Sequence, residues 1–304
     1  MYALLVASSI AFSGPGHFAS TSSTRAPAVT LYGAMAKKWE SSHEGESFVG
    51  TEMRGAAMAL HTKGQAPKEG KAKETKAEQA PVQTWQPGKA DYLQFLVDSK
   101  HVYAALEEIC ASEPKLASFC DSGLERAEPL ARDIAWFADE GVAAPEVAPQ
   151  GSTYATMLRE MVDKGEVEAF VCHFCARARL FLILRTPPAA PSSRADPITL
   201  VFFLRAFTDN FYFAHTAGGR MIGKRMADML LEGKTLNFYQ WDKGDVDKEL
   251  LPGLRGKIDA MADGWTREQK DLCLAQTADS FKFGGALLQH ISRPNAAKEA
   301  AKAA

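Results

Sequence analysis

A histidine and an arginine on one helical face are the first residues whose types and spacing could do chemistry. His61 ends the stretch FVGTEMRGAAMALH, in which apolar and small residues recur at helical spacing. Arg54 lies seven residues earlier, on the same face and about 10 Å away along the helix axis. An imidazole for iron and a cation for a carboxylate at that separation suit a haem. The alternatives are a core or capping histidine and a solvated arginine.

A second candidate is the glycine pair in NFYFAHTAGGRMIGKR, residues 210–225. Gly218 and Gly219 interrupt an otherwise good helix, and each costs about 1 kcal/mol relative to alanine. The ridge they form includes three further small residues, Ala214, Ala217 and Gly223. Two explanations stay open: close helix packing through the Gly219/Gly223 pair, or a flat ligand against a backbone that the glycines allow to kink.

Helices must position both segments. Apolar residues at three- and four-residue spacing predict helices over 47–60, about 92–110, about 123–138, 154–162, 210–231 and 266–291. The last begins with TREQ, a capping box in which Thr266 and Gln269 bond each other's backbone. No alternating strand pattern and no internal repeat is present. The sequence therefore predicts a single all-α domain, with an exposed linker at 64–81.

Composition excludes several classes of protein. The 304 residues carry a net charge of −2, which gives no argument for nucleic acid. The five cysteines are odd in number and scattered, which argues against a disulfide framework and for a reducing compartment. No apolar run reaches the roughly 18 residues that a membrane span needs. We expect a soluble protein that contains no membrane span.

The first 45 residues resemble a targeting segment. An apolar start, MYALLVASSIAF, precedes a tract rich in hydroxyl residues with no acid before Glu40. That order is typical of a bipartite signal and transit segment for a plastid, and a disordered tail is the alternative. The predicted domain then covers 46–291, and 292–304 is expected to be a disordered tail.

Several blocks together resemble plastid haem oxygenases of the plant and algal type. They are MALHTKGQA, YLQFLVDSKHVY, GLERAEPLARDIAWF, NFYFAHTAGGRMIGK, LNFYQWD and WTREQKDLCLAQTADSFKFGGALL, in that order. The resemblance runs from Phe48 to Leu288, with 175–209 excluded. It implies a single-domain helical bundle in which haem is sandwiched between a proximal helix and a kinked distal helix.

The resemblance also implies roles for individual residues. His61 matches the neutral proximal haem ligand, and Gly218 and Gly219 match the glycine pair at the distal kink. Where mammalian and many bacterial members carry Gly-Asp, this sequence has Ala214-His215, as the plant-type enzymes do. His215 is therefore a candidate for organising distal water.

The remaining matched residues contact the haem. Arg54 and Arg255 match basic residues near the propionates, although DKGDVDKELLPG before Arg255 is hard to align. Ala214 and Tyr212 are expected against the haem itself.

The activity implied is cleavage of haem b, both cofactor and substrate, at the α-meso carbon. O₂ and electrons from reduced ferredoxin give biliverdin IXα, CO and Fe²⁺ for bilin synthesis in the plastid stroma. We expect a monomer that is followed in its pathway by a bilin reductase. Basic residues that could meet the acidic ferredoxin, or form an ordinary solvated surface, are Lys63, Lys68, Arg220, Lys224 and Arg225.

Two rival functions stay open. One is a haem-binding or haem-sensing protein that has lost catalysis, against which the presence of His61 argues. The other is a helical scaffold whose glycine ridge only packs helices. The CHFC motif at 172–175 looks like CxxC but has neither a second pair for zinc nor a redox-fold context.

Residues 175–209 interrupt the resemblance. They include Pro187, Pro188 and Pro191, each worth about 3 kcal/mol against a continuous helix. In the family, CHF runs through Tyr-Asn directly into YFAH.

The codons that are possible at the two ends of this segment suggest its origin. If the codon of Cys175 is TGT, its last two bases form a GT splice donor. If the codon of Thr208 is ACA, its final A and the first G of the Asp209 codon form an AG splice acceptor. Excision then removes a whole number of codons and leaves a tyrosine codon before Asn210. We therefore predict a translated intron, with a lineage-specific insertion as the alternative.

Overall fold

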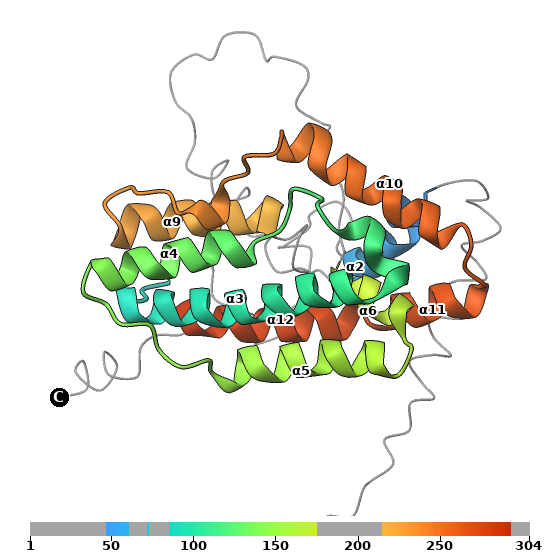
Figure 1. The fold of residues 1–304 in the computed structure, drawn as a ribbon, viewed down its shortest axis with the longest axis horizontal. Helices are drawn as coiled ribbons and strands as arrows, with labels where there is room; N and C mark the ends of the chain where they lie inside the picture. The colour runs from blue at the N-terminus through green and yellow to red at the C-terminus, as the bar shows by residue number, and fades with distance from the viewer. Residues whose placement is uncertain (1–46, 61–71, 73–84, 175–214, 293–304) are drawn as a thin grey trace, which may run out of the picture.

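The structure is a computed structural model that describes residues 47–60, 72, 85–174 and 215–292. Every regular element of that part is a helix (Figure 1), which confirms the predicted all-α class. The predicted targeting segment, the 175–209 insertion, the C-terminal tail and nearly all of the 64–81 linker lie outside the described residues. So do His61, Tyr212 and Ala214.

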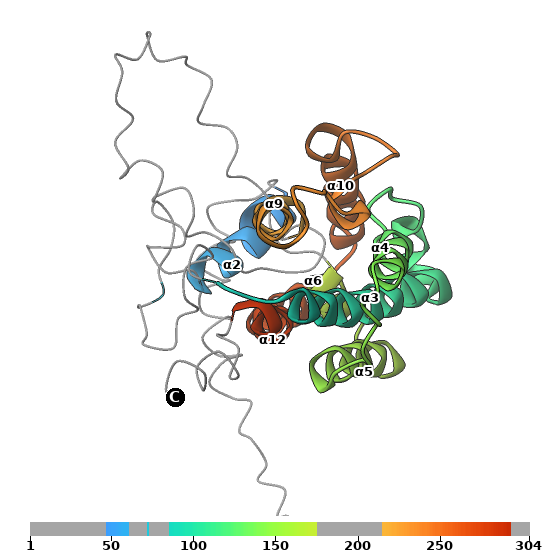
Figure 2. The same cartoon turned by 90° about the vertical axis from the view of Figure 1, so that its left-hand side faces the viewer.

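The centre of the bundle is α3 (Lys89–Ser112), which contacts α4 (Ala127–Asp139), α5 (Pro149–Asp163) and α12 (Thr277–Ser292). These helices run nearly along one axis in Figure 1, and Figure 2 shows them end-on around α3. Apolar residues recur along α3 at helical spacing, and those that are fully buried include Leu93, Leu96 and Leu106. One continuous apolar core joins them to both ends of the described chain.

Shorter helices complete the bundle. α6 (Val167–Phe174), buried at every residue, packs against α11 (Arg267–Ala275). α10 (Leu251–Ala262) follows a π-helical turn, η6 (Val246–Leu250). Two short 3₁₀ helices, η3 (Pro114–Phe119) and η5 (Asn237–Tyr239), lie in the connections.

The predicted helix over 266–291 is wrong in one respect, because it divides at Gln276 into α11 and α12. The Thr277 hydroxyl donates to Leu274 O at 2.7 Å, and the Ser280 hydroxyl donates to Thr277 O at 2.7 Å. Such side-chain bonds to preceding carbonyls compete with the helical ladder and bend helices. The capping box at the start of α11 is confirmed, with both reciprocal bonds present.

A glycine on α5 lies directly against α3. A Cβ at Gly151 would lie 3.0 Å from Cβ and Cγ of Asp98 and 3.1 Å from its Cα, which belong to the rigid core of α3. Gly253 on α10 is exposed, and a Cβ there would meet nothing within 4 Å.

We therefore expect the same substitution to have opposite effects at these two positions. Gly151→Ala should lower the free energy of unfolding by about 1–3 kcal/mol through overpacking. Gly253→Ala should raise it by about 0.5–1 kcal/mol, because alanine loses less backbone entropy in a helix. Urea unfolding of both variants checks this, and a shift of the same sign in both would contradict the packing.

Candidate active site

The predicted kink of the distal helix coincides with a local change of helix type. Residues His215–Gly219 form a π-helical turn, η4, and α9 (Arg220–Leu230) follows directly. Gly218 is buried and Gly219 half-buried. Single π turns inside α-helices are frequent at functional sites and cause kinks. The irregular turn therefore lies where the glycine pair predicted it.

His215 opens that turn inside a buried aromatic enclosure. Its side chain is 7% exposed, and its ring stacks on Phe238 with centroids 3.9 Å apart and an interplanar angle of 18°. Tyr103 meets it edge-on at 6.1 Å, while Tyr239 and Trp241 lie 5.2 and 5.4 Å away. Its Nε2 lies 2.7 Å from the Phe238 carbonyl oxygen.

These surroundings decide the protonation of the ring. Burial, with smaller contributions from Arg126 and Arg220, lowers the pKa of His215 to about 3, against the effect of its bond to Phe238 O. The imidazole is therefore neutral at physiological pH. Because a carbonyl oxygen can only accept, Nε2 carries the hydrogen, and Nδ1 is left as a hydrogen-bond acceptor.

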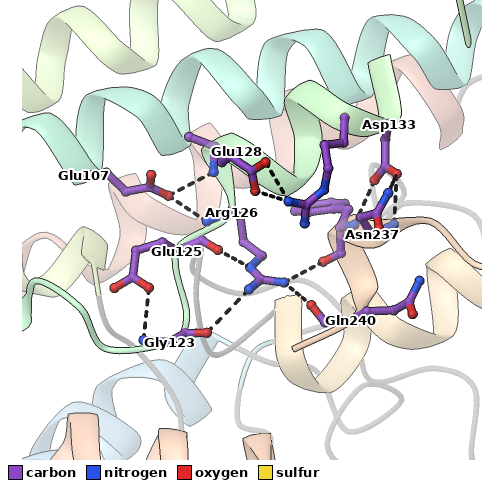
Figure 3. A network of polar contacts seen from close by, with 11 residues as sticks. Glu107, Gly123, Glu125, Arg126, Glu128, Asp133, Asn237 and Gln240 are labelled. Atoms are coloured by element: carbon purple, nitrogen blue, oxygen red, sulfur yellow. Dashed lines mark hydrogen bonds and ion pairs between the residues drawn. The ribbon is translucent and has the colours of Figure 1, made fainter. Parts of the chain in front are cut away.

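The segment that supplies this carbonyl is held by two buried charged side chains (Figure 3). Asp133 of α4 accepts hydrogen bonds from the backbone N–H groups of Asn237 and Phe238 at 2.9 and 2.8 Å. Arg126 donates to Gln240 O and, at 3.4 Å, to Phe238 O. Asp133 thus holds the N–H groups at the start of residues 237–240, and Arg126 holds the carbonyl at their end.

The structure shows why position 223 carries a glycine, which the GxxxG spacing left open. A Cβ there would lie 2.6 Å from three ring atoms of Tyr239, so the Tyr239 ring occupies the space against the backbone of α9. The hydroxyl of Tyr239 lies 3.2 Å from that of Tyr92 on α3. This glycine accommodates an aromatic ring of η5, which neither explanation from the sequence included.

On the proximal side, α2 (Arg54–Leu60) follows a second π-helical turn, η1 (Val49–Met53), and His61 comes directly after the end of α2. Asp259 of α10 binds this segment. Its carboxylate accepts hydrogen bonds from Val49 N at 2.9 Å and from the Ser47 hydroxyl at 2.7 Å. Arg255 lies one turn before Asp259. Asp259 thus joins α10, which carries Arg255, to η1, the turn that precedes α2 and Arg54.

Several described residues have the chemistry that a haem requires. Arg54 on α2 and Arg255 on α10 are cations of the type that pairs with propionates. The interior face of α2 is built from small or flexible residues, with Ala57 and Met58 buried against Phe281 of α12. The turn at Gly218 and Gly219 carries no side chain that would keep a flat group from the backbone.

Other predicted residues have local partners. Arg220 pairs with Asp247 at 3.0 Å and Lys224 with Asp228 at 3.3 Å, both at the surface. Of the CHFC motif, Cys172 is buried with its sulfur 3.7 Å from the Thr277 hydroxyl, and Cys175 lies outside the described residues.

Sequence reasoning missed a second buried histidine within this motif. His173 Nδ1 lies 3.1 Å from the Tyr154 hydroxyl, and its Nε2 lies 3.5 Å from Gln276 Oε1. Burial lowers the pKa of His173 to about 4. It also missed Tyr103, Phe238, Arg126 and Asp133, although the blocks that contain them were recognised.

Comparison with known proteins identifies the family. The chain is 42% identical to Heme oxygenase 1, chloroplastic, of Oryza sativa subsp. japonica over 253 residues, which cover 83% of this chain and 73% of the relative. It is 40% identical to Heme oxygenase 1, chloroplastic, of Arabidopsis thaliana, over 90% of this chain and 85% of the relative. The chain belongs to the haem oxygenase family. The predicted family resemblance is confirmed.

Haem oxygenase relatives that are named as inactive are more distant. A Probable inactive heme oxygenase 2, chloroplastic, from Oryza sativa subsp. japonica is 33% identical and covers 68% of this chain and 52% of the relative. No protein-family model matches the chain. Among the described residues, no helix is long and apolar enough to cross a membrane.

The two buried neutral histidines make stability depend on pH. In the folded state their pKa values of about 3 and 4 lie well below the ordinary value of 6.5. Their contribution is therefore complete above about pH 6.5 and is lost as pH falls, because only the unfolded chain then binds the protons. Each histidine adds at most about 1.4 kcal/mol per pH unit to the slope.

We expect His215→Gln and His173→Gln each to flatten the dependence of unfolding free energy on pH between about pH 6 and 4.5. Above about pH 7.5 each variant should run parallel to the wild type, since neither state takes up a histidine proton there. Urea unfolding across this range checks both parts. A variant that keeps the full wild-type slope would show that its histidine is not buried in the neutral form.

Proposed function

We propose that this chain is a plastid haem oxygenase that cleaves haem b at the α-meso carbon to biliverdin IXα, CO and Fe²⁺. The observation that carries the proposal is its 38–42% identity, over most of its length, to three proteins named as chloroplastic heme oxygenases. The two relatives named as probable inactive match less of the chain at lower identity, so they do not favour a non-catalytic haem-binding protein.

In this proposal each matched residue has one task. His61, directly after α2, ligates the iron, and Arg54 and Arg255 orient the propionates. Gly218 and Gly219, with Ala214 and Tyr212, let the distal backbone lie close to the porphyrin and leave one meso edge accessible. Haem, when bound, supplies both the iron for oxygen chemistry and the carbon skeleton that is oxidised.

The hydrogen bond of His215 determines which of its two ring nitrogens can contact distal water. Since Nε2 is engaged by Phe238 O, Nδ1 is the atom that can accept a hydrogen bond from distal water. A water molecule held in this way keeps a defined orientation and can deliver protons in sequence from solvent. The proposal therefore assigns His215 to the orientation of water.

We further propose that reduced ferredoxin supplies the electrons. The cationic side chains Arg220, Lys224 and Arg225 begin α9, next to the distal turn, so a donor docked there would lie near the haem. The pairs with Asp247 and Asp228 are exposed and worth at most about 1 kcal/mol each, so an acidic partner can displace them. The same proposal includes a downstream bilin reductase as a partner. It also includes a monomeric state.

The plastid location agrees with the chloroplastic relatives and with the targeting segment predicted for residues 1–45. The predicted insertion at 175–209 stands as a separate hypothesis about the gene.

Sequencing the transcript tests the insertion directly. We expect a message in which CHF is followed by Tyr-Asn-Phe-Tyr-Phe-Ala-His, because excision restores the family's pattern in frame. A spliced message that still encodes LFLILRTPP would refute the intron.

A turnover assay tests the activity. The protein encoded by the sequenced transcript, supplied with haem, ferredoxin, its reductase and ascorbate, should replace the haem spectrum with that of biliverdin and release CO. His61→Ala should abolish this conversion, because the iron loses its protein ligand. Haem that binds with unchanged spectrum over many reductant equivalents would instead indicate a haem-binding protein. No oxidation, together with unchanged haem affinity in His61→Ala, would refute the enzyme and the assignment of His61.

A further inference from the structure

The carbonyl that bonds His215 belongs to a residue whose N–H is bonded to a buried carboxylate. Asp133 is 1% exposed, and its two oxygens accept three hydrogen bonds. Oδ1 accepts from the backbone and side-chain N–H groups of Asn237 at 2.9 and 2.8 Å, and Oδ2 accepts from Phe238 N at 2.8 Å. All three come from two consecutive residues that lie more than 100 positions away along the chain (Figure 3).

Phe238 transmits this constraint to the distal turn. Its N–H is fixed by Asp133, its carbonyl oxygen lies 2.7 Å from His215 Nε2, and its ring stacks on the His215 ring. A displacement of Phe238 would therefore move both contacts at once. The next residue, Tyr239, fills the space above Gly223, so the same 3₁₀ turn also positions the start of α9.

We propose that Asp133 is a positioning residue for the reaction, which fixes Phe238 so that His215 keeps its hydrogen on Nε2 and its acceptor on Nδ1. The proposal rests on the proposed function for its consequence in turnover, but not for the tautomer itself. If the Phe238 carbonyl is displaced, the hydrogen can move to Nδ1. His215 would then be a donor where the distal water needs an acceptor.

The first test uses the haem-free protein, so that it does not depend on activity. Asp133→Asn keeps the shape but replaces one acceptor oxygen by an NH₂ group, which must face at least one of the N–H groups of residues 237 and 238. Histidine-ring ¹⁵N NMR should show a single Nε2–H tautomer for His215 in the wild type. In Asp133→Asn it should show a second tautomer or exchange between the two.

Asp98→Asn is the matched control. Asp98 is also a fully buried carboxylate with three hydrogen bonds, from Gln94 Nε2, Ala148 N and His290 Nε2, at the contact between α3, α5 and α12. It should lower stability as Asp133→Asn does and leave the His215 tautomer unchanged. An unchanged tautomer in Asp133→Asn, or an equal change in both variants, would overturn the proposal.

Turnover gives the second readout. With haem, ferredoxin and reductase, Asp133→Asn should lower kcat by about tenfold or more, as expected when proton delivery is misaligned. Its haem Kd should change by less than about threefold, since Asp133 contacts no residue assigned to the haem. A lower haem affinity with unchanged kcat would contradict the assigned role.

Failure of the proposed function is distinguishable from failure of this inference. If the wild type does not convert haem, the proposed function fails, while the NMR comparison still decides whether Asp133 fixes His215. If Asp133→Asn does not fold, Asp133→Glu replaces it, because it keeps the charge but shifts both oxygens relative to the N–H groups of residues 237 and 238. A minor second tautomer in that variant would support the inference, and a single unaltered one would overturn it.

Discussion

The distal side of this protein depends on the backbone hydrogen bonds between residues 237–240 and two buried charged side chains. Outside its single turn η5, this segment has few backbone partners of its own, and buried backbone polar groups must be paired. Arg126 supplies several donors from one rigid group and binds the carbonyls, while Asp133 binds the N–H groups. Hydrogen bonds to charged groups are worth about 1.5–3 kcal/mol each, more than neutral ones. Two charged side chains therefore hold this irregular segment in place.

The irregular distal turn depends on contacts with this firmly held segment. A π turn with two glycines is intrinsically weak, because glycine loses more entropy on folding than any other residue. Its first residue, His215, is held by the Phe238 carbonyl and by aromatic rings, and Gly223, eight residues later on α9, lies against Tyr239. Both contacts come from the segment that Arg126 and Asp133 fix. These contacts compensate for the weakness of the glycine-containing turn.

The sequence predicted most of the longer helices, since apolar spacing and the TREQ cap are local signals, but it did not predict α6 and α10. The division at Gln276 was missed because it depends on whether Thr277 and Ser280 bond the preceding carbonyls, which spacing does not reveal. The surroundings of His215 were missed for another reason: its rings come from Tyr103 and from 238–241, far apart in sequence. Gly223 was interpreted by a helix-pairing pattern, whereas its neighbour is an aromatic ring from a loop. Long-range contacts of this kind require the fold.

The neutrality of His215 restricts the chemistry that the distal side can perform. With a pKa near 3, the imidazole holds no proton to give at the pH of a plastid, so it cannot act as a general acid. A carboxylate at the same place would be charged and would accept from several waters, whereas this ring offers one acceptor in one direction. In the proposed function, proton delivery would then run through water, and His215 would set the direction in which that water points. Orientation of this kind is sensitive to small displacements, which is why a carboxylate as remote as Asp133 can matter for it.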